Sequence, residues 1–261
     1  MSDAALREGH YAVKQIFCRD RLIAWSHRRR FEIGLRLAQA RGARRLLDYG
    51  CGDGTFLGLL FGRDRHPAEA VGAELDAAQI DDCRARLGSE PRLSFTSIAA
   101  LNAPEHDAAY DLVVCMEVLE HVVPLDRVLD SLLRLTAPGG TLLVSVPVET
   151  GLPLLVKQAT RRVAGWRGLG DYATTVAYTW REYAAGVFAG RRPHMIRPVY
   201  THADGTLFHD HKGFNWRVLH DRVAERFAIE RVIASPFPRI GARLATQVWF
   251  VCRKPARTLP V

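Results

Sequence analysis

The sequence lacks any apolar run near the ~18 residues that a membrane-spanning helix needs, so no transmembrane segment is expected. Its first ten residues contain no apolar stretch of the secretory kind, and none follows the arginine run at 28–30. The five cysteines are scattered, odd in number and form no CxxC pair, which disfavours a disulfide framework or a structural zinc site. These absences favour a cytoplasmic protein.

Lysine is also scarce, with 4 lysines against 32 arginines, a bias typical of a GC-rich bacterial genome. The 261 residues are 48% hydrophobic and 25% charged, which is a globular composition. The length suits one large α/β domain, or one domain with a sizeable insertion.

The net charge of +8 is unevenly distributed. Residues 1–45 carry +7, residues 46–150 carry −10 and residues 151–261 carry +11. Such an asymmetry is expected where basic flanks meet an anionic partner, and it is equally expected of a solvated basic surface.

Short apolar segments alternate with helical patterns between residues 45 and 147. Strands are expected at 45–49, 70–74, 93–96, 110–115 and 141–146, and at 227–234 and 246–252 after an interruption. Helices are expected at 4–40, 55–60, 77–87, 125–135 and 214–226. This alternation predicts a mostly parallel sheet covered by helices on both faces. Residues 150–208 break the pattern and contain two helical candidates, at about 152–166 and 173–189.

A glycine-rich turn follows the first strand, with glycines at positions 50, 52 and 54. Glycine allows a sharp turn and a close approach to a ligand, and the following helix N-terminus favours an anionic group. A nicotinamide fingerprint would need a third glycine at position 55, where Thr55 stands. The spacing is therefore GxGxG, with an acid, Asp48, two residues before the first glycine.

This pattern resembles motif I of the class I S-adenosylmethionine-dependent methyltransferases. Three later segments resemble this family in the same order: VGAE at 71–74, YDLVVCMEVLEH at 110–121 and LTAPGGTLL at 135–143. The resemblance implies a Rossmann-like seven-stranded fold. It also implies that S-adenosyl-L-methionine is the cofactor and S-adenosyl-L-homocysteine the product, as in bacterial methyltransferases of types 11 and 23.

The resemblance also assigns cofactor-binding roles by position. Asp48 is expected to orient the methionine amino end, and Glu74 to accept hydrogen bonds from both ribose hydroxyls. The other expected cofactor-binding residues are Tyr49, Gly50, Cys51, Gly52, Gly54, Leu75, Ser97, Ile98, Cys115 and Met116. Ser97 and Ile98 stand where relatives often carry an acid for the adenine, and a backbone carbonyl is the alternative there.

An oxygen acceptor with a high pKa needs a general base. The candidates are His121, His209 and His211, together with Glu149. A packing role, with a bond to a backbone carbonyl, is the alternative for His121. Because the acids near His121 do not form an HExxH motif, no metal site is predicted.

We expect in-line methyl transfer to a small-molecule, glycan or lipid-linked acceptor, with an anionic group and with oxygen as the methylated atom. Arginines and aromatic residues of the flanks would select it. These aromatic residues are Trp25, Trp166, Tyr172, Tyr178, Trp180, Tyr183 and Phe188. A nucleic-acid methyltransferase is an alternative suggested by the basic charge, although no NPPY, DPPY or Pro-Cys motif is present. A non-catalytic cofactor-binding protein and a hydride-transfer enzyme are further alternatives.

The expected division of the chain has three parts. Residues 1–45 form an N-terminal helical substrate cap, 46–149 and 209–254 form the Rossmann-like core, and 150–208 form a helical insertion that also caps the substrate. The segment Leu152–Trp166 has an apolar start and a basic second half. It fits either a cap helix or a peripheral helix on the inner membrane face. The oligomeric state does not follow from the sequence.

Overall fold

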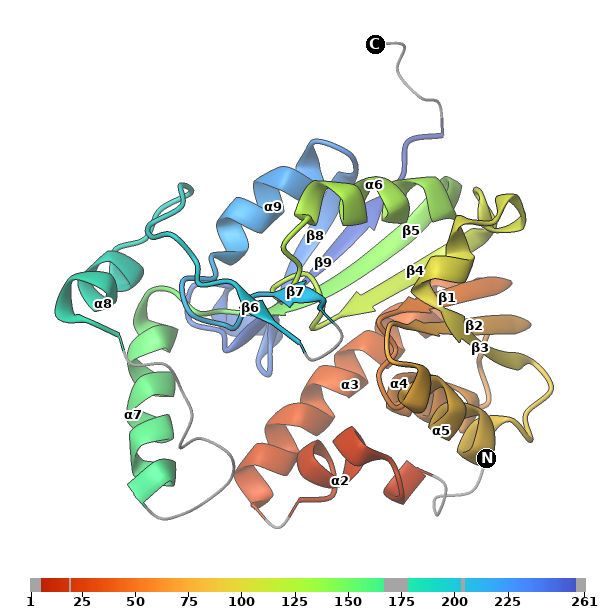
Figure 1. Cartoon of the computed structure of the whole chain (residues 1–261), viewed down its shortest axis with the longest axis horizontal. Coiled ribbons are helices and arrows are strands. Elements are labelled where there is room, and N and C mark those ends of the chain that lie inside the picture. Colours follow the sequence, from red (N-terminus) through yellow and green to blue (C-terminus); the bar gives the residue numbers. More distant parts are fainter. Residues whose placement is uncertain (1–5, 19, 167–177, 203–204, 257–261) are drawn as a thin grey trace.

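A computed structural model describes residues 6–18, 20–166, 178–202 and 205–256 (Figure 1). Seven strands form one sheet in the order β3-β2-β1-β4-β5-β9-β8. Strands β1 to β5 pair in parallel, whereas β9 pairs antiparallel with both of its neighbours. The predicted mostly parallel sheet of seven strands is confirmed.

The bounds of most elements lie close to those expected from the sequence. The sheet strands are β1 (Arg45–Tyr49), β2 (Glu69–Glu74), β3 (Leu93–Ser97), β4 (Tyr110–Met116), β5 (Thr136–Pro147), β8 (Ala228–Ser235) and β9 (Gln247–Arg253). The helices are α2 (His10–Gln15), α3 (Arg21–Arg41), α4 (Thr55–Phe61), α5 (Ala77–Leu87), α6 (Leu125–Leu135), α7 (Leu152–Trp166), α8 (Trp180–Val187) and α9 (Trp216–Ala224). Short 3₁₀ segments are η1 (Ile98–Asn102), η2 (Pro104–His106) and η4 (Pro238–Ile240).

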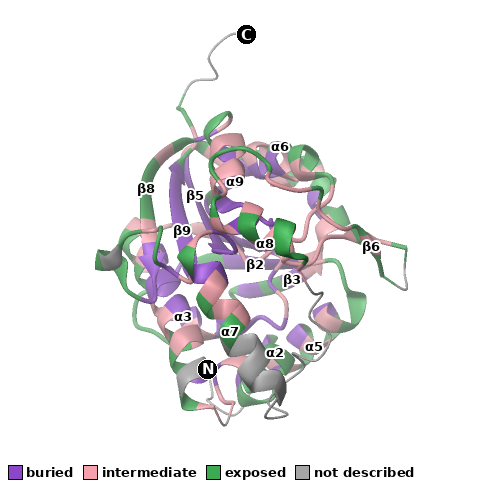
Figure 2. Cartoon of the chain, turned by 90° about the vertical axis from the view of Figure 1, so that its left-hand side faces the viewer, coloured by how far each residue is buried: buried purple, intermediate pink, exposed green. Residues whose placement is uncertain are grey.

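The central strands of the sheet are buried, whereas most of the edge strand β8 is exposed (Figure 2). Successive side chains of a strand point to opposite faces. In β1, Leu46 accordingly joins an apolar cluster with residues of α3, α4 and α5, whereas Leu47 joins a cluster with residues of α6 and α9. Figure 1 shows these helices on the two sides of the sheet. Apolar strands between two helical layers are the arrangement that the alternating pattern predicted.

The N-terminal helix expected at 4–40 is interrupted, which corrects the prediction. Helix α2 ends at Gln15 and α3 begins at Arg21. The carboxylate of Asp53 accepts hydrogen bonds from the backbone N–H groups of Tyr11 (2.9 Å) and Ala12 (3.0 Å). The first N–H groups of α2, which have no partner within the helix, are thus bonded by Asp53, and this anchors the start of α2 at the glycine turn.

The segment between β5 and α9 contains two helices and a small hairpin. Helix α7 has the expected bounds, and α8 coincides with the later part of the second helical candidate. Residues 173–177 of that candidate, and Tyr172, lie outside the described residues. The two-residue strands β6 (Tyr200–Thr201) and β7 (Leu207–Phe208) were not predicted, because they are too short to show a period. No helix in the described ranges is both long and apolar enough to cross a membrane. Membrane contact by α7 stays a prediction.

Candidate active site

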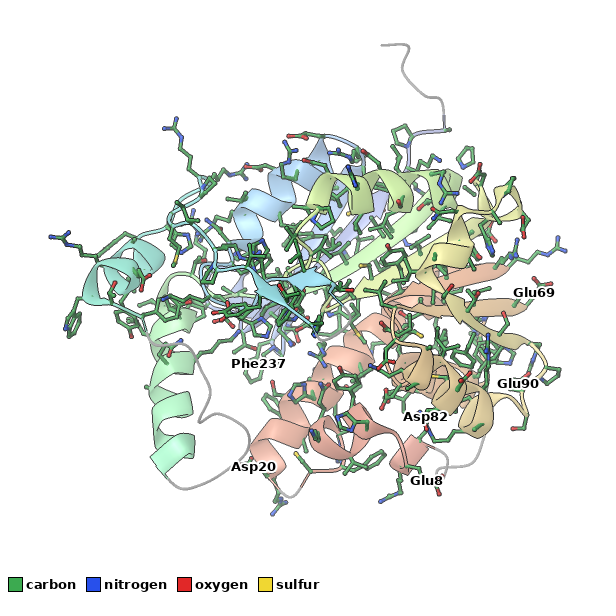
Figure 3. The ribbon with its side chains drawn as sticks, viewed as in Figure 1. Glu8, Asp20, Glu69, Asp82, Glu90 and Phe237 are labelled. Carbon is green, nitrogen blue, oxygen red and sulfur yellow. The ribbon has the colours of Figure 1, made fainter. Side chains whose placement is uncertain are left out.

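A large cavity of about 2260 Å³ lies at the carboxyl ends of the parallel strands. Its wall includes the glycine turn after β1, the ends of β2 and β4, one side of α3, part of α7 and residues 206–208 and 210–212. Figure 3 shows Phe237, another wall residue, in the region between α3 and α7. Ligands of open parallel sheets bind at this edge, which makes the cavity the candidate active site.

The glycine turn has a backbone that only glycine adopts easily. Gly50, Gly52 and Gly54 have φ angles of 75°, 55° and 70°. A Cβ atom at Gly50 would stand 2.4 Å from a methyl group of Val118, closer than any non-bonded contact allows. The turn is also fixed by a hydrogen bond from Gly50 N–H to the carbonyl of Ala73 in β2 (2.8 Å). The backbone of the turn is therefore held in one conformation at the cavity wall, where glycine permits the close approach.

Glu74, at the end of β2, supports this turn directly. Its carboxylate accepts hydrogen bonds from the backbone N–H groups of Gly52 (2.8 Å) and Leu75 (2.7 Å). Both Glu74 and Leu75 line the cavity. The sequence pointed to Glu74 as a ligand-binding acid, and the structure adds that it orients the turn. A carboxylate has enough lone pairs to do both.

Asp48, at the end of β1, is only 2% exposed. Burial, and then the charges of Glu74 and Asp53, raise the pKa of Asp48 from 3.8 to about 8. Such a carboxyl loses its proton readily when a cation binds beside it. The position and chemistry suit a ligand with an ammonium group.

The structure places the other predicted cofactor-binding residues in different environments. Tyr49, Cys51, Ile98 and Met116 line the cavity. Ser97 ends β3 and its hydroxyl accepts a hydrogen bond from Ala100 N–H (3.1 Å), so it caps η1. Cys115 is fully buried in the apolar cluster under α6 and is not part of the cavity wall.

Asp53 was missed as a site residue. Besides holding α2, its carboxylate accepts hydrogen bonds from the N–H (3.1 Å) and hydroxyl (2.6 Å) of Thr55. Tyr11 consequently lies over the turn, with its ring 3.3 Å from where a Cβ of Gly52 would stand. An acid before Thr55 was a local signal for a helix N-terminus. Its partners in α2 were not visible in the sequence, because they lie far away along the chain.

Glu117, just after β4, was a second miss. It has a φ angle of 57°, which is unusual for a residue other than glycine. Its carboxylate accepts hydrogen bonds from the Ser145 hydroxyl (2.8 Å) and the Gln247 amide (3.2 Å), and pairs with Arg30 (3.1 Å). The side chain of Arg30 is only 5% exposed. This buried network ties α3 to the strand ends at the cavity wall.

Two of the three predicted catalytic histidines lie together. The rings of His121 and His211 are 4.8 Å apart, and both line the cavity. Burial lowers the pKa of both, to about 4 for His211. His121 Nδ1 donates to the carbonyl of His209 (2.8 Å), which leaves Nε2 as the lone-pair nitrogen. The alternative of a packing role for His121 included such a bond to a backbone carbonyl. The ring nevertheless lines the cavity.

His209 points elsewhere. Its Nδ1 donates to the carbonyl of Pro198 (2.7 Å), and it is not part of the cavity wall. Glu149, the remaining proposed base, is 1% exposed and pairs with Lys157 of α7 (2.8 Å). Both Glu149 and Lys157 line the cavity beside the two histidines.

Comparisons with known proteins agree with this geometry. Residues 20–188 match the family described as "Methyltransferase domain". A ubiquinone biosynthesis O-methyltransferase of Psychrobacter arcticus is 30% identical over 47% of this chain and 46% of its own length. A trans-aconitate 2-methyltransferase of Methylobacterium radiotolerans is 37% identical over 42% of this chain and 40% of its own length. The match thus spans less than half the length of these relatives.

Likeness in structure extends further than likeness in sequence. The crystal structure of the N-methyltransferase NodS from Bradyrhizobium japonicum superposes with a TM-score of 0.54 at 17% identity, covering 91% of this chain and 99% of that one. At this identity the likeness shows the fold alone.

The residues present fit the family's cofactor, S-adenosylmethionine. The glycine turn brings its backbone to the cavity wall, Asp48 suits the ammonium group, and Glu74 suits the ribose hydroxyls. The chain belongs to the class I S-adenosylmethionine-dependent methyltransferases.

Proposed function

We propose that this protein transfers the methyl group of S-adenosylmethionine to a hydroxyl oxygen of a small, planar acceptor. One observation carries the proposal. The same cavity is lined by the glycine turn and by a second group of residues, His121, His211 and Lys157. A cofactor bound at the turn therefore shares one space with imidazole groups that can act on a hydroxyl.

The acceptor class is supported by the cavity wall and by the relatives. Trp25 and Phe237 line the cavity with ring centroids 5.4 Å apart, and such rings pack well against a planar molecule. One relative is named for O-methylation in ubiquinone biosynthesis and another for trans-aconitate. Both names favour small acceptors over polynucleotides. Glycans and lipid-linked compounds come next, because the cavity is large.

Methyl transfer needs little covalent chemistry from the protein. The bound cofactor supplies a sulfonium methyl group that is already activated. The acceptor oxygen forms the new C–O bond, the electron pair of the broken C–S bond stays on sulfur, and the hydroxyl proton leaves to solvent with the help of the imidazole groups. Glu74 and the glycine turn hold one reactant, and the second group of cavity residues orients the other. Such positioning can contribute roughly 7–11 kcal/mol.

The direct test is formation of S-adenosylhomocysteine by the purified protein with a panel of acceptors. The panel contains catechols and other phenols, di- and tricarboxylic acids, lipid-linked sugars and an RNA oligonucleotide. Methylation of a phenol, located on oxygen by mass spectrometry and NMR, would support the proposal. Turnover of the RNA alone, or methylation on nitrogen or carbon, would contradict it.

Replacement of Glu74 by alanine should raise the dissociation constant of S-adenosylhomocysteine by about 100-fold. The change removes charge-assisted hydrogen bonds to the ligand and the support of Gly52. Glu69→Ala is the matched control, because Glu69 begins the same strand at the end remote from the cavity (Figure 3). Calorimetric titration measures both variants. Equal affinities would remove Glu74 from the cofactor site.

Replacement of His121 by alanine should leave the affinity for S-adenosylhomocysteine within about twofold and lower kcat by about 100-fold. The ring faces the acceptor region rather than the glycine turn, so the two quantities should separate. His220→Gln, on α9 and outside the cavity wall, is the control. Full turnover of the His121 variant from pH 6 to 9 would show that the ring only packs.

A further inference from the structure

Glu120 is a buried acid without a partner. It is 0% exposed, and neither carboxylate oxygen has a hydrogen-bond partner among the described residues. Burying such a group unpaired costs several kcal/mol unless something compensates it. The neighbouring Glu117, whose side chain is 20% exposed, has three partners, whereas the more deeply buried Glu120 has no hydrogen-bond partner in the described part of the chain.

Two imidazole nitrogens lie beside this carboxylate. His121 Nε2 is 3.8 Å from Glu120 Oε1, and one ligand atom from each of Glu120, His121 and His211 lies within 4.8 Å of the others. Nδ1 of His211 is buried and has no hydrogen-bond partner in the described part of the chain. All three residues line the cavity. The cluster therefore presents unused nitrogen and oxygen lone pairs toward a common space.

The backbone holds these ligand atoms together from two distant parts of the chain. His209 N–H donates to the carbonyl of His121 (2.9 Å), and Arg197 donates to the carbonyls of both Glu120 and Asp210. The bond from His121 Nδ1 to the His209 carbonyl fixes the orientation and tautomer of the ring. A ligating histidine usually has such a second bond, because it orients the lone pair toward the ion.

We propose that Glu120, His121 and His211 bind a divalent first-row transition-metal ion. One carboxylate and two imidazoles form a ligand set for ions such as Mn²⁺, Fe²⁺ or Zn²⁺, and three protein ligands leave coordination positions open. Those positions face the cavity. The sequence predicted no metal, because the local spacing is not HExxH and His211 lies far from the other two ligands in the chain.

The ion would bind the acceptor hydroxyl, and the two imidazoles would then act on the hydroxyl as ligands of the ion and not as bases. A metal-bound oxygen acid has a lowered pKa, so the hydroxyl could lose its proton to water near neutral pH and attack as an alkoxide or phenolate. This role rests on the proposed O-methylation, whereas metal binding itself does not depend on it.

The test titrates the full chain, freed of metals by chelation, with Mn²⁺ alone and follows free Mn²⁺ by electron paramagnetic resonance. We expect one saturable site per chain. Glu120→Gln and His211→Ala should each weaken Mn²⁺ binding at least 10-fold. Even the loss of a residue that only hydrogen-bonds a metal ligand weakens metal binding 10- to 100-fold, and loss of the ligand itself should cost no less. His220→Gln should bind as the wild type. Unchanged binding of S-adenosylhomocysteine by each variant verifies its fold.

Absence of saturable Mn²⁺ binding to the wild type, or binding that survives both ligand substitutions, would overturn the metal site. A separate assay of phenol methylation with and without Mn²⁺ tests whether the ion activates the acceptor hydroxyl. If the ion binds at these residues and no hydroxyl acceptor is methylated, the proposed function fails and the metal site stands.

Discussion

The folded chain should lose stability as the pH rises from about 4 to about 8 because of Asp48. The pKa of this carboxyl is raised from 3.8 to about 8 by burial and then by the charges of Glu74 and Asp53. Between these values the unfolded chain has released the proton and the folded chain still holds it. Folding is therefore penalised increasingly up to pH 8, and the full penalty applies above that value. At about 1.4 kcal/mol per pKa unit, it reaches about 6 kcal/mol.

Asp48→Asn should remove this dependence, so the variant should melt higher than the wild type at pH 9 and near it at pH 5. Thermal unfolding at both pH values measures the difference, and Asp81→Asn on the exposed side of α5 is the control. An excess of S-adenosylmethionine should reduce the difference in melting temperature between variant and wild type at pH 9, because the ligand's ammonium group favours the ionised form of Asp48. An equal difference in melting temperature at both pH values would contradict the raised pKa of Asp48.

Replacement of Trp249 by alanine should lower the free energy of unfolding by about 3–5 kcal/mol. Trp249 is fully buried at the centre of β9, where it pairs with Ser145 and Ile233. Its ring packs on Gly34 of α3, where a Cβ would stand only 2.6 Å away. The cavity left by alanine would lie directly under α3, which cannot collapse into it without moving the active-site wall.

Urea unfolding measures this loss, and Trp180→Ala supplies the matched control. Trp180 begins α8 and is 86% exposed, so its removal should change the free energy by less than about 0.5 kcal/mol. A loss below 1 kcal/mol for the Trp249 variant would mean that α3 does not rely on this contact.

Local sequence determined much of the core. The glycine turn requires positive φ angles that the sequence supplies with Gly50, Gly52 and Gly54, and the alternation of apolar strands with helices fixed the order of the parallel part. Asn215 caps α9, because its side chain accepts a hydrogen bond from Arg217 N–H (3.0 Å). In each case, the cause lies within a few residues of the effect.

The tertiary structure alone decided what depends on distant partners. Asp53 anchors the separate short helix α2 at the glycine turn, since its carboxylate accepts from N–H groups some forty residues earlier in the chain. Cys115 and Met116 are adjacent, yet only Met116 reaches the cavity, because alternate residues of a strand face opposite sides.

The catalytic region shows the same division most clearly. The sequence singled out three histidines by type, but it could not pair them, because periodicity and motifs do not report contacts between segments far apart. The fold turned His209 toward Pro198 and brought His211 to His121 and the unpartnered Glu120. By itself the sequence determined the family, the fold and the cofactor. The grouping of side chains beside the cofactor depended on long-range packing, which only the tertiary structure supplies.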